Sequence, residues 1–187
     1  MSDELLDIVD ENNKLTGESA PRSKVHSEGI WHRTVHIYLF RKNNNKIEFL
    51  VHLRSKFKDL HPNHWDTRFG GHIKEGMTLE EGVKNELEEE IGLKVDGNKL
   101  IEGAWRKKDK MPDRQFTRVY YFEYNDSTEN LKFNDGEVQE VKWMSLDDIK
   151  ESMVNKSKNW APSLKGFTEI SDYLIKAISA FGGKKQD

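Results

Sequence analysis

Hydrophobic and polar residues alternate along several short segments of the first half of the chain, a pattern that is typical of half-buried strands. In residues 31–41 one face carries Val35, Ile37 and Leu39. The other face carries His32, Thr34, His36, Tyr38 and Phe40. Residues 5–9 are interpreted as a short strand, and residues 46–54 as the returning strand of a hairpin whose turn is the asparagine run 43–45.

The second half predicts further strands and two helices. The strands are expected at 100–107, 117–124 and 138–144, and the helices at 146–153, capped by Ser145, and at 164–180. Loops are expected at 18–29, 56–63, 108–114 and 157–161, and the tail 182–187 is expected to be disordered.

One longer segment, residues 70–93, has helical rather than strand periodicity. Val83, Leu87 and Ile91 recur every four residues and predict an apolar stripe that faces a core. Thr78, with Glu81 three residues later, has the spacing of a capping box, and Gly92 is a natural helix end. Helices and strands together predict an α/β or α+β sandwich with a mixed sheet in a single domain that spans residues 1–187.

The same helix carries Glu86, Glu89 and Glu90 on a neighbouring face, with Glu88 on the opposite side. Like charges at this spacing destabilise an isolated helix by roughly 0.2–0.5 kcal/mol per pair. A solvated acidic surface is one explanation. A divalent cation between the carboxylates is the other, and oxygen ligands of this kind suit Mg²⁺ or Mn²⁺.

Composition excludes several classes of protein. The net charge of −3 argues against a general nucleic-acid or anionic-membrane surface. The chain has no cysteine, which excludes disulfides, thiolate metal sites and cysteine nucleophiles. No signal peptide is visible and no apolar run approaches the roughly 20 residues that span a bilayer, so we expect a soluble, cytoplasmic protein.

The segment that begins at Gly71 resembles the Nudix box, whose pattern is Gly, five residues, Glu, seven residues, Arg-Glu-apolar-any-Glu-Glu-any-Gly-apolar. Seven of the nine specified positions match without a gap: Gly71, Glu86, Leu87, Glu89, Glu90, Gly92 and Leu93. The first glutamate is replaced by Met77 and the arginine by Asn85. Since both partners of a charged pair are lost together, we interpret this as a coordinated change.

The resemblance implies a Nudix-type α/β/α sandwich with the Nudix box at 71–93, and a hydrolase that cleaves a diphosphate linkage. It implies Mg²⁺ or Mn²⁺ bound by Glu86, Glu89 and Glu90, with the backbone carbonyl of Gly70 or Gly71 facing the ion. One of these glutamates, or Glu137 downstream, would be the general base. The expected partner is a small nucleoside diphosphate-type or other organic diphosphate, and a homodimer is left open.

The diphosphate also requires cations. Arg54 and Arg68 are the first candidates because they flank the Nudix box, and Arg22, Arg33 and Lys56 are weaker ones.

Residues 3–165 also resemble the branch of the family related to isopentenyl-diphosphate isomerase, on segments such as LRSKFKDLHPNHWDTRFGGH and NDGEVQEVKWMSLDDI. That isomerase has a catalytic cysteine immediately before its Gly-His pair, where this chain has Gly70. It also builds a metal site from histidines, and His26, His32 and His72 are the candidate counterparts. Two departures speak against such a site: His26 is one residue off the expected spacing, and Gln115 stands near the place of an acidic ligand. Two alternatives to the hydrolase are therefore an isomerase-like enzyme and a diphosphate-binding protein with little turnover.

Overall fold

The computed structural model describes residues 3–58, 60–133 and 136–182. Its strands are β1 (Leu5–Val9), β2 (Leu15–Pro21), β3 (His32–Asn43), β4 (Lys46–Arg54), β5 (Trp65–Asp66), β6 (Leu100–Lys110), β7 (Asp113–Glu123) and β8 (Val138–Ser145). Its α-helices are α1 (Arg22–Glu28), α2 (Leu79–Ile91), α3 (Leu146–Val154) and α4 (Leu164–Gly182). Two short 3-10 helices span Gly97–Lys99 and Thr128–Asn130.

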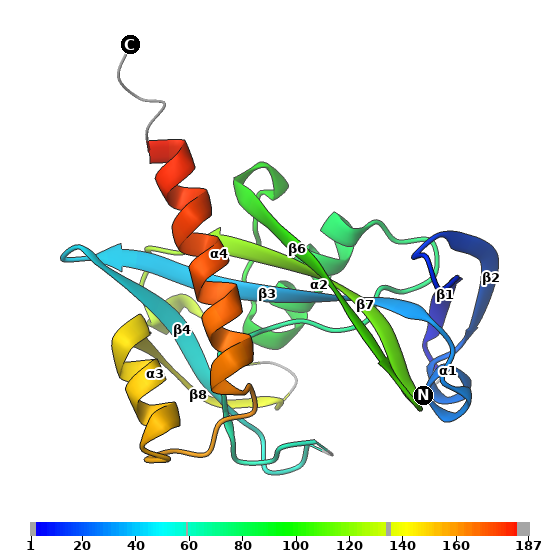
Figure 1. Ribbon diagram of the computed structural model, residues 1–187, viewed down its shortest axis with the longest axis horizontal. Coiled ribbons are helices and arrows are strands. Elements are labelled where there is room, and N and C mark those ends of the chain that lie inside the picture. The colour runs from blue at the N-terminus through cyan, green and yellow to red at the C-terminus, as the bar shows by residue number, and fades with distance from the viewer. Residues whose placement is uncertain (1–2, 59, 134–135, 183–187) are drawn as a thin grey trace.

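A mixed sheet separates α2 from α3 and α4, so the predicted three-layer sandwich is confirmed (Figure 1). β3 pairs in parallel with β7, and the other paired strands are antiparallel. β7 also pairs with β6, and β4 also pairs with β8.

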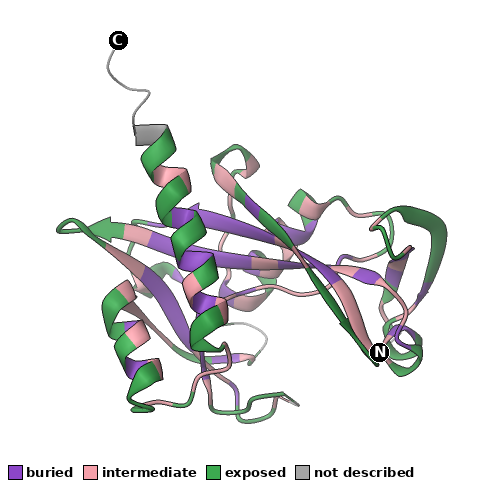
Figure 2. Ribbon diagram, in the orientation of Figure 1, coloured by how far each residue is buried: buried purple, intermediate pink, exposed green. Residues whose placement is uncertain are grey.

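The two faces of β3 bury different cores, as its alternation predicts. Val35, Ile37 and Leu39 pack in one cluster with the stripe of α2. Tyr38 and Phe40 pack in a second cluster with residues of α3 and α4. Buried residues accordingly concentrate along β3, β4 and β7 in Figure 2.

Helix α2 begins and ends where the sequence predicts. The Thr78 side chain accepts a hydrogen bond from the Glu81 N–H, and the Glu81 carboxylate accepts one from the Thr78 N–H, which completes the capping box. Gly92 ends the helix in the left-handed conformation, with φ of 65°. Val83, Leu87 and Ile91 are fully buried, and each contributes roughly 1.5–3 kcal/mol of hydrophobic free energy.

Residues 65–73 lie between β3 and β4 where these two strands diverge. Residue Ile37 exchanges backbone hydrogen bonds with Phe69, and the Val35 N–H donates to the Gly71 carbonyl at 2.9 Å. On the other side, β5 pairs with β4. The Gly70–Gly71 pair is thereby held at the sheet, and residues 72–78 connect it to α2.

Two loop predictions are wrong. Residues 18–29 form the end of β2 and all of α1, because Val25 is buried in a small core with Leu6 and Ile8 of β1. Residues 108–114 belong almost entirely to the hairpin of β6 and β7, which extends to Lys110 and resumes at Asp113. The predicted disordered tail lies, beyond Gly182, outside the described residues.

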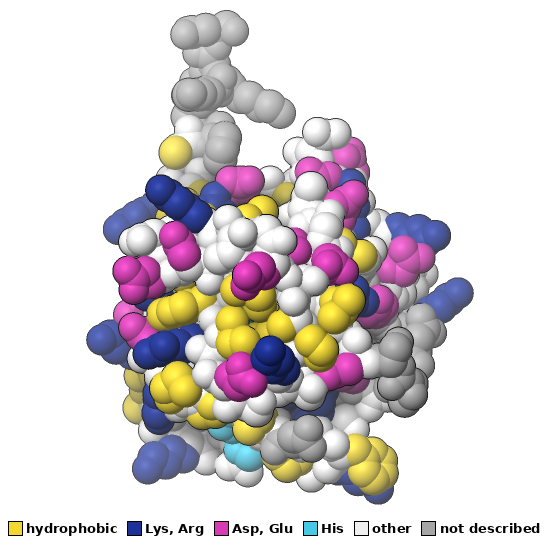
Figure 3. Space-filling view, turned by 90° about the vertical axis from the view of Figure 1, so that its right-hand side faces the viewer, with side chains coloured by type: hydrophobic (Ala, Val, Ile, Leu, Met, Phe, Trp, Pro, Cys, Tyr) yellow, Lys and Arg dark blue, Asp and Glu magenta, His cyan; other side chains and the backbone are white. Residues whose placement is uncertain are grey.

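The end of the molecule that carries β1, β2 and α1 shows hydrophobic side chains ringed by acidic and basic ones (Figure 3). This surface, where the view describes it, has mixed charge and not the continuous basic stripe typical of a nucleic-acid footprint. Among the described helices, none is long and apolar enough to cross a membrane.

Candidate active site

Two cavities meet at Gly70, and they differ in charge. The first, here called the carboxylate cavity, has a volume of about 200 Å³ and is lined by Glu4, Arg22, Lys58, Gly70, Gly71, His72, Glu86, Glu89, Glu90 and Glu137. The second, the cationic cavity, has a volume of about 160 Å³ and is lined by His36, His52, Arg54, Lys58, Arg68, Gly70, Glu90, Glu137 and Val138. Lys58, Gly70, Glu90 and Glu137 line both, so the two cavities adjoin.

Helix α2 supplies the carboxylates. Glu86, Glu89 and Glu90 all line the carboxylate cavity, whereas Glu88 is exposed and pairs with Lys94 at 3.2 Å. Burial, followed by the neighbouring charge of Glu89, raises the pKa of Glu86 to about 7. The structure thus gathers the three glutamates that the helical spacing placed on one face.

The two glycines leave room for these carboxylates and for the backbone. A Cβ at Gly71 would lie 2.5 Å from a carboxylate oxygen of Glu86. Gly70 has a φ of 132°, and a Cβ there would lie 2.1 Å from the Val35 carbonyl oxygen. No side chain fits at residue 70 without moving β3. A cysteine, which the isomerase has at this position, would therefore not fit here.

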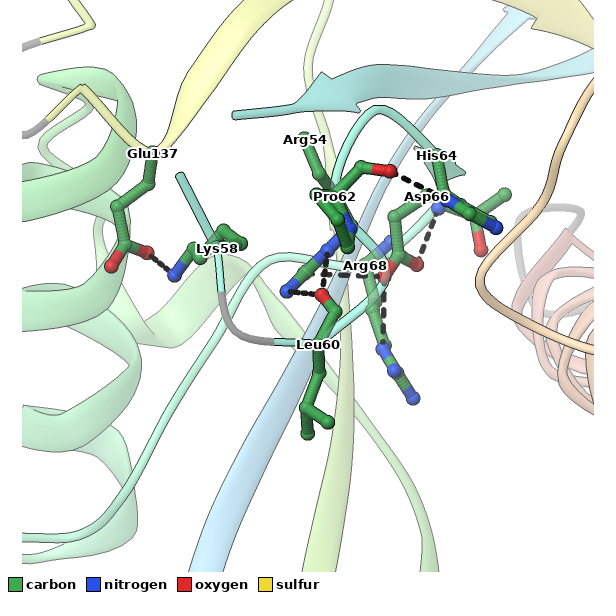
Figure 4. Close-up of polar contacts among 9 residues, drawn as sticks. Arg54, Lys58, Leu60, Pro62, His64, Asp66, Arg68 and Glu137 are labelled. Carbon is green, nitrogen blue, oxygen red and sulfur yellow. Dashed lines mark hydrogen bonds and ion pairs between the residues drawn. The ribbon is translucent and has the colours of Figure 1, made fainter. Parts of the chain in front are cut away.

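A buried carboxylate organises the cationic cavity (Figure 4). Asp66 is fully buried, and its Oδ2 lies 3.6 Å from Arg54 Nη1 and 3.3 Å from Arg68 Nε. Its Oδ1 accepts hydrogen bonds from the N–H groups of Thr67 and Arg68. Asp66 neutralises one of two guanidinium charges, so the group keeps a net positive charge.

Loop residues complete the cation set differently from the prediction. Lys58, rather than Lys56, lines both cavities, and its Nζ pairs with Glu137 (Figure 4). Lys56 Nζ instead lies 4.9 Å from the centre of the Phe57 ring. Of the weaker candidates, Arg22 lines the carboxylate cavity, while Arg33 binds Asn13 away from both cavities.

Two histidines in the cationic cavity were not recognised from the sequence as site residues. Burial, and then the charge of Arg68, holds the pKa of His36 well below its usual value. Burial lowers the pKa of His52 to about 4. Both rings are therefore neutral near pH 7. The sequence shows that both histidines lie in predicted strands. It does not show that β3 and β4 diverge and leave a cavity beside the two rings.

A second group of histidines lies beside the carboxylate cavity. Ligand atoms of His26, His32 and His72 all lie within 4.8 Å of one another. The Nε2 atoms of His26 and His72 are 3.0 Å apart, and His32 Nε2 is buried with no hydrogen-bond partner among the described residues. Burial lowers the pKa of all three, so each offers a neutral ring nitrogen near pH 7.

The sequence model of the NUDIX domain matches residues 30–164, which is most of the chain. The chain belongs to the Nudix family. It is 32% identical to a Nudix hydrolase of Clostridium acetobutylicum, described as uncharacterised, over 83% of this chain and 77% of that protein. It is also 32% identical to Nudix hydrolase 3 of Arabidopsis thaliana over 97% of this chain but only 22% of that much longer protein. The family and these relatives identify a hydrolase that acts on diphosphate bonds.

Solved structures share the fold. A Deinococcus radiodurans crystal structure matches with a TM-score of 0.66 at 22% identity, over 84% of this chain and 92% of that one. The NUDIX domain of Shewanella oneidensis NrtR, complexed with ADP ribose, matches with a TM-score of 0.58 at 17% identity, over 78% of this chain and 87% of that one. The branch related to isopentenyl-diphosphate isomerase stays an expectation of the sequence.

Proposed function

We propose that this protein is a metal-dependent hydrolase that cleaves the diphosphate linkage of a nucleoside diphosphate-type or other small organic diphosphate. One observation carries the proposal: the three glutamates of α2 share a cavity with Gly70, and a cationic cavity adjoins it. The carboxylates fit a divalent cation and the guanidinium groups fit phosphate oxygens. The complex of the Shewanella domain with ADP ribose supports a ligand of this class.

The carboxylates of Glu86, Glu89 and Glu90, with a carbonyl of Gly70 or Gly71, would hold Mg²⁺ or Mn²⁺. The ion, when bound, neutralises phosphate charge and lowers the pKa of water. We assign Gly70 ahead of Gly71, because the Gly71 carbonyl already accepts the hydrogen bond of Val35.

Glu137 is the proposed general base, because it lies at the junction of the two cavities. It would take a proton from water while the water oxygen bonds to phosphorus. The bridging P–O bond breaks and its electron pair leaves with the second phosphate, which Arg54, Arg68 and Lys58 stabilise.

A substrate panel tests this function. Nucleoside diphosphate sugars, dinucleoside polyphosphates, nucleoside triphosphates, coenzyme A and isopentenyl diphosphate are each incubated with Mg²⁺ or Mn²⁺, and the products are separated. At least one member is expected to be cleaved, and Glu137→Gln should lower kcat without raising the Mg²⁺ requirement. Isomerisation of isopentenyl diphosphate without cleavage of any member would overturn the proposal. Tight binding without cleavage would favour the diphosphate-binding alternative.

We further propose that His26, His32 and His72 hold one transition-metal ion, as the resemblance to the isomerase implies. Three neutral imidazoles suit zinc, copper, iron or nickel better than magnesium. Asp113 is among the charges that act on His26 and His32, so a carboxylate lies on the same side. Metal content after dialysis against Zn²⁺ should fall in His72→Asn and persist in His64→Asn, whose ring lies outside the cluster. Equal metal content in both variants would contradict the site.

A further inference from the structure

His52 is buried at the cationic cavity with a polar atom that lacks a partner. Its side chain is only 4% exposed, and Nδ1 makes no hydrogen bond to the described residues. The ring lies 4.6 Å from that of Phe69, which fixes its orientation in the sheet. Because a buried polar atom without a partner costs free energy, this nitrogen favours a ligand oxygen or a bound water.

The cations near His52 favour a phosphate, while the carboxylates of the lining, Glu90 and Glu137, lie where this cavity adjoins the carboxylate cavity. Arg54 and Arg68 present planar guanidinium groups, which bind phosphate oxygens in pairs. Both are held by Asp66, so their positions are set before a ligand arrives. The neutral ring of His36 lines the same cavity and can add one N–H donor.

The size and lining of the cationic cavity exclude a nucleoside. Its volume of about 160 Å³ is below the roughly 300 Å³ at which pockets for drug-sized ligands begin. Apart from the histidine rings, Val138 is the one apolar side chain of its lining. The cavity is also smaller than the carboxylate cavity beside it.

We infer that the cationic cavity is a socket for a terminal phosphate, and that His52, Arg54 and Arg68 bind it. This inference rests on the proposed hydrolase function and narrows its substrate to organic diphosphates that end in a free phosphate. The second phosphate then lies at the Glu90–Gly70 junction, and the organic group extends from the carboxylate cavity. A substituent on the terminal phosphate would have to share the cavity's volume of about 160 Å³ with that phosphate.

The reaction of such a substrate balances simply. Water adds OH to one phosphorus, the bridging P–O bond breaks, and the products are inorganic phosphate and an organic monophosphate. ADP would give AMP and phosphate. ADP-ribose, whose diphosphate is substituted at both ends, has no terminal phosphate for the socket.

Calorimetric titration of inorganic pyrophosphate in the presence of Mg²⁺ tests His52. His52→Asn keeps an amide N–H near the place of Nδ1 and should bind within about threefold of the unchanged protein. His52→Leu removes the donor and should bind about tenfold more weakly, which corresponds to about 1.4 kcal/mol. His64→Asn, which changes a half-buried histidine outside the cavity, is the control. Pyrophosphate binding by His52→Leu as tight as that of the unchanged protein would overturn the role of His52.

The unchanged protein gives a second test that does not depend on the folding of any variant. ADP should bind at least tenfold more tightly than ADP-ribose, because both carry the same adenosine diphosphate and only ADP ends in a free phosphate. Equal or tighter binding of ADP-ribose overturns the socket. If ADP-ribose binds at least as tightly as ADP and is also cleaved, the socket is overturned but the hydrolase proposal stands. A preference for ADP without cleavage of any diphosphate would leave the socket standing and refute the hydrolase.

Discussion

The carboxylate cavity and the cationic cavity adjoin, yet the chain balances their charges in opposite ways. Glu86, Glu89 and Glu90 repel one another on one helix, and burial raises the pKa of Glu86 to about 7. Arg54 and Arg68 instead share the buried carboxylate of Asp66, which belongs to the protein itself. In the carboxylate cavity Lys74 offsets part of the charge, since its Nζ lies 3.1 Å from Glu89 Oε1, and the proposed divalent cation would offset more. The cationic cavity carries its own counter-ion in Asp66.

This difference reverses the effect of removing a carboxylate. In the carboxylate cavity a neutral substitution relieves repulsion in the metal-free protein and removes a proposed metal ligand. In the cationic cavity a neutral substitution leaves two guanidinium groups without their shared partner. Activity should therefore depend most on Glu86, Glu89 and Glu90, whereas the stability of the fold should depend most on Asp66.

The largest expected effect is on catalysis, from Glu89→Gln or Glu90→Gln. Each change keeps the shape of the side chain but removes a negative ligand. We expect kcat/KM to fall at least about tenfold and the Mg²⁺ requirement to rise, since even the partners of metal ligands contribute 10–100-fold. Thermal stability without metal should hold or increase.

Glu88→Gln is the matched control, because Glu88 is on the same helix but outside the cavity. Its activity should stay within a factor of about two or three, the range of surface substitutions. An Mg²⁺ titration of each variant decides the matter. If Glu88→Gln weakens metal binding as much as Glu90→Gln, the assignment of the site to this helix face is wrong.

Asp66→Asn should have the next largest effect, and it is on folding. Removing one partner of a fully buried ion pair typically costs about 3–5 kcal/mol, but Arg68 is partly exposed, so we expect about 1–3 kcal/mol. Urea unfolding measures it. Glu140→Gln, which breaks the surface pair with Lys142, should change stability by less than about 0.5 kcal/mol. Similar losses in both variants would show that Asp66 does not organise its cavity.

The two cavities should also give the metal-free protein opposite pH dependences. The pKa of Glu86 rises from 4.5 to about 7 on folding, so the folded state binds more protons and this contribution to stability is lost as pH rises from 4.5 to 7. The pKa of His52 falls from 6.5 to about 4, so its contribution is lost as pH falls from 6.5 to 4. Both variants are treated with a chelator and their melting temperatures are measured at each pH. Glu86→Gln should lose the decrease in stability between pH 4.5 and 7, and His52→Asn should lose the decrease between pH 6.5 and 4. Melting curves with the same pH dependence as the unchanged protein would contradict the corresponding pKa shift.

The carboxylate cavity was largely predictable from the sequence because its acids lie within one turn and a half of a helix. The capping box of Thr78, the stripe of Val83, Leu87 and Ile91, and the end at Gly92 all follow from local spacing, and each is present. The alternation of β3 also placed its two faces correctly.

The cationic cavity could not be predicted in the same way because its residues come from β3, β4, the loop after β4, the segment after β5, α2 and the start of β8. The sequence analysis names Lys56 and does not name Lys58, since nothing local shows which lysine of a loop turns toward a cavity. His36 and His52 read as ordinary strand residues, because strand periodicity does not reveal where two strands diverge. The helix α1 was missed because its seven residues bury only Val25.

The smallest expected effect concerns Met77 and Asn85, which replace the charged pair of the Nudix box. In the structure the Asn85 amide nitrogen lies 3.5 Å from the Met77 sulfur, so the two replacements contact each other. Met77 also packs against the core beneath α2, so Met77→Glu alone would place an unpaired carboxylate there. Asn85→Arg alone would likewise add a charge without a partner. The double variant should therefore be more stable than the sum of the single effects, with a coupling of about 0.5 kcal/mol or more by urea unfolding. Additive single effects would remove the interpretation of a coordinated change and leave two independent substitutions.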